Sequence, residues 1–296
     1  MTKIALIDGD ELTYKAGFAS QHVHYECYES EDSEECLSKF AYKKQAVEWA
    51  SDKEGIIIRK TLEVKDVDEA YMNLQSAFRT IMSDTKASDY RIFLTGEDNF
   101  RFKVATIRPY KDRDPESKPV HYMALKAILV EEYFAKVVDG IEADDALSIA
   151  QYDSFREKGS WKSVETIICT QDKDLNMVPG PRYSPRTREI SFITPEEARH
   201  FFFCQLLTGD ETDSIPGIHN IGMKTASKIF KSFKPKDEKD YYRITISQYE
   251  NAMKLLKCKE KLPTDLPVVD IVNEIGNLLW MKRSIDDTWT PEVQFV

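Results

Sequence analysis

The sequence predicts an α/β fold built on a central, mostly parallel sheet that is flanked by helices. Short apolar runs recur along the chain, and each ends in acidic or small polar residues. Segments with helical periodicity separate these runs. Strands that alternate with helices are typical of a parallel sheet, in which ligands bind beyond the carboxyl ends of the strands.

Apolar runs mark the predicted strands, and the periodic segments between them mark the predicted helices. The strands are Ile4–Ile7, Arg91–Leu94, Lys136–Val138 and Thr166–Cys169, and the helices are Val67–Ser83, Val120–Tyr133 and Ala143–Lys158. Acidic residues that follow these strands are therefore expected to meet at one edge of the sheet.

Residues 22–63 interrupt this alternation and are predicted to form an insertion. An acidic run from Glu26 to Glu35 is more typical of a solvated surface than of a cation site. A helix is predicted near Lys39–Ser51, and His22–Tyr28 is expected to pair with Ile56–Leu62. From about residue 195 onward the patterns become helical.

The composition is that of a globular protein, with 42% hydrophobic residues and a formal net charge of −10. This charge argues against a nucleic-acid-binding surface spread over the whole chain, so any such surface must be local. The cysteines are scattered, and no apolar stretch approaches a membrane-spanning length. The sequence therefore predicts a cytoplasmic protein with neither a disulfide framework nor membrane association.

Acidic residues gather at the predicted strand ends and helix starts. Any one pair, such as Asp172 and Asp174, is explained as readily by a helix cap or a turn. Together, crowded carboxylates repel one another unless cations or protons neutralise them, and oxygen ligands without His or Cys suit Mg²⁺ or Mn²⁺. The candidate metal ligands are Asp8, Asp10, Glu142, Asp144, Asp145, Asp172, Asp174, Asp210 and Asp213.

Two segments are basic despite the overall acidity. The first contains Arg101, Lys111 and Arg113 among aromatic residues, and the second runs from Ser214 to Lys236 without any acidic residue. In the second, a glycine-containing turn leads into a helix, an arrangement that binds phosphate through backbone N–H groups. A plain helix–turn–helix with a solvated lysine face is the structural alternative. The candidate DNA-contacting residues are Gly217, Ile218, Asn220, Ile221, Gly222, Lys224, Thr225 and Lys228.

An ordered set of motifs runs through the chain from residue 4 to about residue 235. In chain order they are Asp8-Gly9-Asp10, Phe100-Arg101, Tyr110-Lys111, Glu142-Ala143-Asp144-Asp145, Thr170–Leu175, Thr208–Gly217 and Ile221–Ala226. Each motif alone is weak, but the ordered set is specific. It resembles the 5′-nuclease (flap endonuclease) family, which includes the 5′-nuclease domain of bacterial DNA polymerase I and the exonucleases of short-tailed bacteriophages.

The resemblance implies a PIN-like core at residues 1–203, with the insertion at about 22–63 and a helical arch at about 100–125. A helical subdomain at 204–296 would carry a DNA-binding helix–turn–helix of the H3TH type. Two or more Mg²⁺ ions, replaceable by Mn²⁺, would bind the candidate carboxylates, and K⁺ would bind at the helix–turn–helix. From the arch, Arg101, Lys111 and Arg113 would hold the 5′ strand near the ions.

The chain departs from the family pattern at two places. Thr95 stands where the family carries Asp after its second strand, and Asp10, Glu97 or Asp98 is the expected substitute. Arg113 follows Lys111 by two residues, where the family usually has a spacing of three.

Taken together, the residues and the resemblance predict a Mg²⁺-dependent 5′–3′ exonuclease or structure-specific 5′ nuclease. Its substrates would be duplex DNA with a 5′ end, flap or nick, and RNA–DNA hybrids, during replication, primer removal or DNA degradation. A cytoplasmic monomer is expected, in the host cytoplasm if the source is a phage. The alternatives are a catalytically inactive nucleic-acid clamp, which predicts missing carboxylates, and a PIN-type ribonuclease, which typically lacks the turn at Gly217–Thr225.

Overall fold

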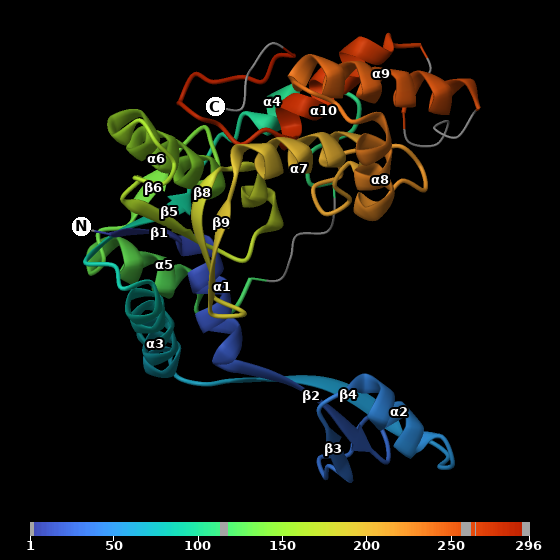
Figure 1. Cartoon of the computed structure of the whole chain (residues 1–296). Helices are drawn as coiled ribbons and strands as arrows, with labels where there is room; N and C mark the ends of the chain where they lie inside the picture. The colour runs from blue at the N-terminus through green and yellow to red at the C-terminus, as the bar shows by residue number, and fades with distance from the viewer. Residues whose placement is uncertain (1–2, 113–117, 256–261, 264, 292–296) are drawn as a thin grey trace. The chain divides into compact units, whose positions relative to one another are not determined.

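The computed structural model describes residues 3–112, 118–255, 262–263 and 265–291 (Figure 1). The predicted site residue Arg113 lies outside the described residues. The contacts divide the chain into two compact units. The first comprises residues 1–10, 81–116 and 130–296, and the second comprises residues 11–80 and 117–129.

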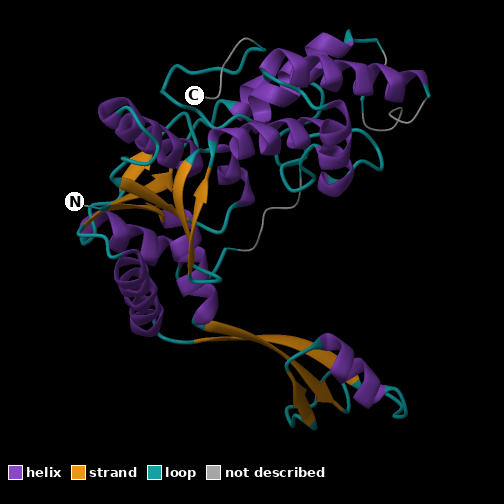
Figure 2. Cartoon of the chain, viewed as in Figure 1, coloured by secondary structure: helices purple, strands orange, loops and turns teal. Residues whose placement is uncertain are grey.

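The first unit is built on a six-stranded sheet in the order β6-β5-β1-β7-β8-β9 (Figure 2). Its strands are β1 (Ile4–Asp8), β5 (Asp89–Thr95), β6 (Lys136–Val138), β7 (Thr166–Cys169), β8 (Gly180–Ser184) and β9 (Glu189–Ile193). All neighbouring strands are parallel except β8 and β9. The prediction of an α/β fold with a mostly parallel sheet is confirmed.

The centre of this sheet is apolar because its strands are buried on both faces. Every residue of β7 is buried, as are the middle three residues of β1. Helix α6 (Ala143–Lys158) packs across β1, β5 and β7. It begins at a capping box formed by Glu142 and Asp145 and ends at Gly159, whose φ of 69° is readily adopted by glycine. The predicted bounds of α6 and β7 are the observed ones.

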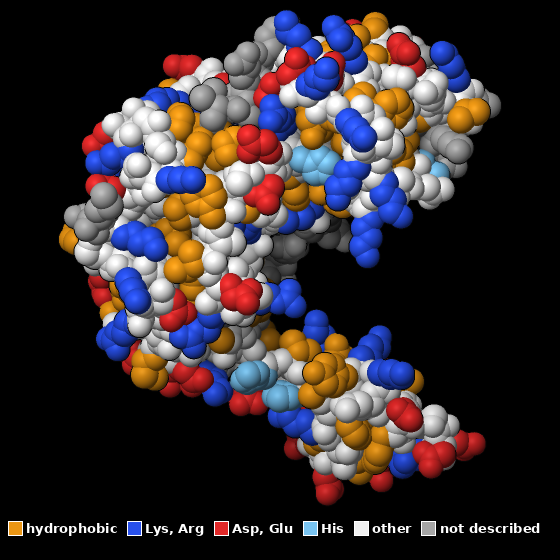
Figure 3. Space-filling model, viewed as in Figure 1, with side chains coloured by type: hydrophobic (Ala, Val, Ile, Leu, Met, Phe, Trp, Pro, Cys, Tyr) orange, Lys and Arg blue, Asp and Glu red, His pale blue; other side chains and the backbone are white. Residues whose placement is uncertain are grey.

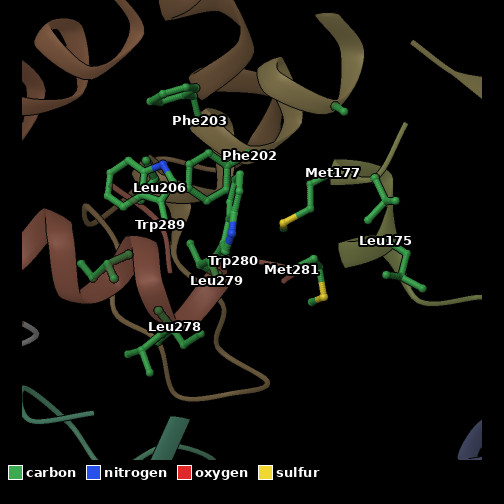
Figure 4. Packing of buried hydrophobic residues seen from close by; sticks show 14 of the residues in the cluster. Leu175, Met177, Phe202, Phe203, Leu206, Leu278, Leu279, Trp280, Met281 and Trp289 are labelled. Carbon is green, nitrogen blue, oxygen red and sulfur yellow. The ribbon is translucent and has the colours of Figure 1, made fainter. Parts of the chain in front are cut away.

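A layer of helices makes up the rest of the first unit (Figure 1). It comprises α4 (Arg101–Val104), the short 3₁₀ helix η1 (Lys173–Met177), α7 (Pro195–Thr208), α8 (Met223–Phe233), α9 (Glu238–Lys254) and α10 (Val268–Leu279). Phe202 of α7 lies at the centre of the core, with its ring centroid 5.0 Å from Trp280 and 5.3 Å from Trp289 (Figure 4). Helix α7 runs through the predicted domain boundary at 203/204, so the observed units do not divide there.

The second unit contains the predicted insertion as a three-stranded antiparallel sheet in the order β3-β2-β4. Its strands are β2 (Gln21–Tyr28), β3 (Ser38–Phe40) and β4 (Ile57–Val64), and helix α2 (Lys43–Ala50) packs against β2 and β3. Tyr28 pairs with Ile57 and Val23 pairs with Leu62. The predicted pairing of these two strands is therefore confirmed, as is the helix between them.

Three further helices complete the chain, and each contributes to both units. They are α1 (Gly9–Ala19), α3 (Val67–Thr85) and α5 (Tyr122–Glu131). In the second unit, the ring of Tyr14 in α1 lies 5.1 Å from that of Tyr122 in α5. Across the described ranges, no helix has both the length and the apolar character needed to cross a bilayer. The four described cysteines are free.

Candidate active site and nucleic-acid interface

The carboxyl ends of the parallel strands place acidic residues from distant parts of the chain at one edge of the sheet. Asp8 ends β1, Asp172 follows β7, and Asp144 lies in the first turn of α6, which follows β6. We define the carboxylate cluster as Asp8, Glu142, Asp144, Asp172, Asp174, Asp210 and Asp213.

Asp144 is a half-buried member of the carboxylate cluster. Its Oδ1 atom is inaccessible to solvent and has no hydrogen-bond partner among the described residues. Burial raises the pKa of Asp144 well above its usual range, and the charges of Asp172, Asp8 and Glu142 raise it further. A carboxylate oxygen that is buried among like charges without a donor is unfavourable unless a proton or a cation neutralises the group.

The remaining members extend this repulsion through the cluster. Burial, followed by the charge of Asp172, raises the pKa of Asp174 to about 7, and Asp210 also contributes. Burial also raises the pKa of Asp213, to which Glu142 and Asp210 add. Repulsion between carboxylates therefore links the members of the cluster in sequence, from Asp8 at the end of β1 to Asp213 after α7.

Side chains that the sequence analysis did not single out hold parts of this cluster. Tyr110 Oη lies 2.9 Å from Asp213 Oδ2 and 3.1 Å from Glu142 Oε2, so its one proton is shared between the two carboxylates. Lys173 Nζ lies 2.7 Å from Asp210 Oδ2, and Gln205 Nε2 donates to Asp174 Oδ1 at 2.5 Å. Tyr110 and Lys173 both lie inside the family motifs, whereas no motif marks Gln205.

Oxygen donors without His or Cys suit a hard divalent cation, and the unpartnered Oδ1 of Asp144 fits such a ligand. Among the described residues, no three Asp, Glu, His or Cys side chains are already arranged as a metal-binding group. The chemistry of the carboxylate cluster therefore fits divalent cations, while side-chain adjustment would be needed to complete a coordination shell.

Two predicted basic residues reach Glu142 of the carboxylate cluster: Lys111, and Arg101, whose Nη1 lies 3.6 Å from Glu142 Oε2. Lys111 is the more exposed of the two. Its Nζ lies 2.5 Å from Glu142 Oε1 and 4.0 Å from Asp213 Oδ1, and the side chain is 34% exposed. Burial lowers the pKa of Lys111, but the charges of Glu142 and Asp213 raise it by more. The lysine stays charged and is accessible from solvent.

Arg101 and Asp145 were predicted as separate site residues, and the structure pairs them with each other. The Arg101 guanidinium is 1% exposed and donates to both carboxylate oxygens of Asp145, at 2.6 and 3.0 Å. Asp145 also accepts hydrogen bonds from the backbone N–H groups of Glu142 and Lys282. Its oxygens are therefore occupied by protein donors rather than open to a cation, and Arg101 does not lie on an exposed arch.

Asp10 contacts the end of β5. Its Oδ2 accepts a hydrogen bond from the backbone N–H of Thr95 at 2.9 Å. The Asp10 carboxylate thus lies at the end of β5, where Thr95 replaces the family's Asp, but this oxygen is engaged by the backbone. The Oγ1 of Thr95 in turn accepts from the N–H of Ala143 at the start of α6.

The predicted DNA-binding turn leads into α8, with Gly222 at the N-cap. Gly209 and Gly217 let the backbone segments before and after the acidic loop pack directly together, since a Cβ on Gly217 would lie 2.1 Å from the Thr208 carbonyl. Gly217 and Ile218 are buried, which leaves them to shape the turn. Asn220, Gly222, Lys224, Thr225 and Lys228 are exposed, and Ile221 is half-buried.

Basic side chains gather over α8 (Figure 3). The turn also lines a cavity of about 870 Å³ that is bordered by Lys173 and Asp210. The helix N-terminus and the carboxylate cluster therefore belong to one continuous region of the first unit.

Curated proteins with similar sequences include bacterial DNA polymerases. The thermostable DNA polymerase I of Thermus thermophilus is 22% identical over 223 residues, which cover 68% of this chain and 26% of that protein. The DNA polymerase I of Thermus aquaticus is 30% identical over 171 residues, which cover 52% of this chain and 20% of that protein. A 5′-3′ exonuclease of Buchnera aphidicola is 28% identical over 155 residues, covering 48% and 52%. The resemblance to the 5′-nuclease family is confirmed.

The chain spans about a quarter of the length of the first of these polymerases. No family model matches the chain. Solved structures of the T5 5′-exonuclease and of the T5 D15 flap endonuclease, the latter in a pseudo-enzyme–product complex with DNA and metal ions, align at 16% identity with TM-scores of 0.48 and 0.49. Each alignment covers 94% of this chain and 95% of the other.

Proposed function

We propose that the chain is a divalent-cation-dependent nuclease that hydrolyses phosphodiester bonds near the 5′ ends, flaps or nicks of duplex DNA. The observation that carries this proposal is the buried, unpartnered carboxylate oxygen of Asp144 within a cluster of like charges. Sequence relatives that include a 5′-3′ exonuclease support the same activity. RNA–DNA hybrids are proposed as further substrates, and Mg²⁺ as the cation.

In this mechanism Asp8, Glu142, Asp144, Asp172, Asp174, Asp210 and Asp213 would hold the cations. Bound divalent cations lower the pKa of a water nucleophile and neutralise charge on the leaving oxygen. Asp145 is left out of this set because it is fully buried and Arg101 contacts both of its oxygens. Asp10 is left out because its Oδ2 accepts the backbone N–H of Thr95 at the end of β5.

Lys111 would bind the scissile phosphate. Its ammonium group is charged, half-buried and next to Glu142, so an incoming phosphate oxygen could share it without a large movement of the backbone. Tyr110 holds Glu142 and Asp213 close together by sharing its hydroxyl proton between them. The exposed backbone and lysines at the start of α8 would bind the duplex phosphates without reading sequence.

The test is cleavage of 5′-labelled blunt, nicked, flapped and RNA–DNA hybrid duplexes, with Mg²⁺ or with chelator. Wild-type protein is expected to cut only with the cation, and Asp172→Asn to bind duplex DNA without cutting it. Asp153→Asn is the matched control, because Asp153 is an exposed residue of α6 paired with Arg156. Cation-independent cutting, or a wild-type rate in Asp172→Asn, would refute the proposal. Binding without any cleavage would favour a nucleic-acid clamp, and cleavage of RNA alone a PIN-type ribonuclease.

A further inference from the structure

The buried guanidinium of Arg101 joins three elements of the first unit. Besides the two bonds to Asp145 in α6, its Nε donates to the backbone oxygen of Leu278 at 2.9 Å, and Nη2 donates to that of Trp280 at 2.9 Å. Arg101 itself begins α4. A planar guanidinium can serve a carboxylate and two carbonyls at once, which a lysine ammonium cannot do in the same geometry.

Asp145 lies in the first turn of α6, and the Nη1 of the same guanidinium lies 3.6 Å from Glu142 Oε2 of the carboxylate cluster. Asp145 Oδ2 also accepts from the backbone N–H of Glu142 at 3.2 Å, which closes the capping box. Glu142 and Asp144 flank this arrangement. Any displacement of the Arg101–Asp145 pair would therefore move the start of α6 and redirect both cluster members.

The backbone acceptors of Arg101 belong to a structured segment, Leu278–Trp289, which we call the C-terminal clamp. Trp280 Nε1 donates to Asp287 Oδ2 at 2.8 Å, and the N–H of Arg283 donates to the same oxygen at 2.8 Å. The rings of Trp280 and Trp289 pack against Phe202 of α7 (Figure 4). The clamp therefore presents its carbonyls from a fixed position.

We propose that Arg101 is a positioning residue that ties the C-terminal clamp to the start of α6 and so sets the cation affinity of the carboxylate cluster. The inference rests on the proposed function. It assigns a role at the active site to the C-terminal clamp, a segment that contributes no member of the carboxylate cluster. Partners that orient the ligands of a metal typically change metal affinity or activity by roughly 10–100-fold when they are removed.

The test compares Arg101→Lys with wild type by isothermal titration with Mn²⁺ alone and by steady-state cleavage. Arg101→Lys is expected to bind Mn²⁺ at least roughly tenfold more weakly. Its kcat should fall while its KM for duplex DNA stays within about twofold, because the Arg101 side chain is only 1% exposed. Arg199→Met is the matched control, since it breaks a largely buried ion pair with Glu238 between α7 and α9 and should leave both values unchanged.

Trp280→Phe keeps the test decisive if Arg101→Lys does not fold. This change removes the indole donor to Asp287 but retains the backbone oxygen that Arg101 contacts. Weaker Mn²⁺ binding and faster proteolysis of the C-terminal clamp are expected. Unchanged Mn²⁺ affinity in whichever variant folds, or a raised KM at constant kcat, would overturn the inference. Wild-type protein that neither binds Mn²⁺ nor cleaves would instead overturn the proposed function.

Discussion

Replacing Asp144 by Asn should stabilise the protein in the absence of divalent cations while abolishing cleavage. Asn keeps the shape of the side chain but removes a buried charge that faces Asp172, Asp8 and Glu142. Active sites that hold like charges together sacrifice stability for function in this way. The direction of the effect is opposite to that of most substitutions of buried residues.

The size of the stabilisation has a ceiling that follows from protonation. At pH 7 the folded protein can always relieve the repulsion by protonating Asp144, whose ordinary pKa is 3.8. Protonating a carboxyl costs about 1.4 kcal/mol for each pH unit above its ordinary pKa, so the repulsion at Asp144 cannot destabilise the protein by more than about 4 kcal/mol at pH 7. Relaxation and solvent screening reduce this, and we expect Asp144→Asn to gain about 1–4 kcal/mol.

The pH dependence has a defined sign. A carboxyl whose folded pKa is raised lowers stability once the pH exceeds its unfolded pKa, so the wild type loses stability as the pH rises from about 4. The advantage of Asp144→Asn should therefore shrink toward zero near pH 4 and be largest above pH 7.

Urea unfolding in chelator between pH 4.5 and 8 measures this difference, and the same series with Mg²⁺ should favour the wild type. Asp153→Asn, an exposed change in the same helix, should alter stability by less than about 1 kcal/mol. If Asp144→Asn were as stable as the wild type or less stable at pH 7 in chelator, the carboxylate would be a structural partner and the reasoning would fail.

Three other changes probe the interface, the fold and a surface ion pair. Lys224→Ala should reduce the slope of the logarithm of the duplex-binding constant against the logarithm of salt concentration by about one unit. Lys239→Ala on α9 should leave this slope unchanged. Equal slopes in the two variants would exclude α8 from the DNA interface. Gly217→Ala should lower the free energy of unfolding, measured in urea, by at least about 2 kcal/mol, because the new Cβ would meet the Thr208 carbonyl. Gly222→Ala, where a Cβ would meet open space, should lower it by less than about 1 kcal/mol. Equal losses of stability in the two variants would contradict the close packing at Gly217. Hydrogen bonds from Arg188 and then Tyr183 lower the pKa of Asp84 to about 2, so its stabilisation is present above pH 4 and is lost toward pH 2. Asp84→Asn should flatten thermal stability over that range, and an unchanged profile would exclude the pairing.

Much of the sheet could be predicted because its strands have simple apolar patterns. Thr166–Cys169 and Ala143–Lys158 have the predicted bounds, since the first is wholly buried and the second has a capping box at its start and a glycine just after its end. The hairpin of β8 and β9 was not predicted. Its strands contain Gly180, Pro181 and exposed polar residues, so they show no regular alternation of apolar and polar side chains.

The sequence could predict where in the fold the candidate site lies, but not which side chains in it pair with one another. Strand ends indicate where carboxylates gather, yet pairing depends on side-chain contacts between residues far apart in the sequence. Arg101 lies in a basic, aromatic stretch that resembles an exposed surface, but its partners are Asp145 and the carbonyls of Leu278 and Trp280. Spacing alone could not separate this buried pair from the cation-binding carboxylates.

The most direct test of the account is to locate bound cations in a crystal of the full chain soaked in Mn²⁺. An anomalous difference map should show a peak within about 2.3 Å of Asp144 Oδ1 that is shared with at least one of Asp8, Glu142 and Asp172. A map with no peak at Asp144, or with Mn²⁺ bound only away from the carboxylate cluster, would contradict the claim that this edge of the sheet is a cation-dependent active site.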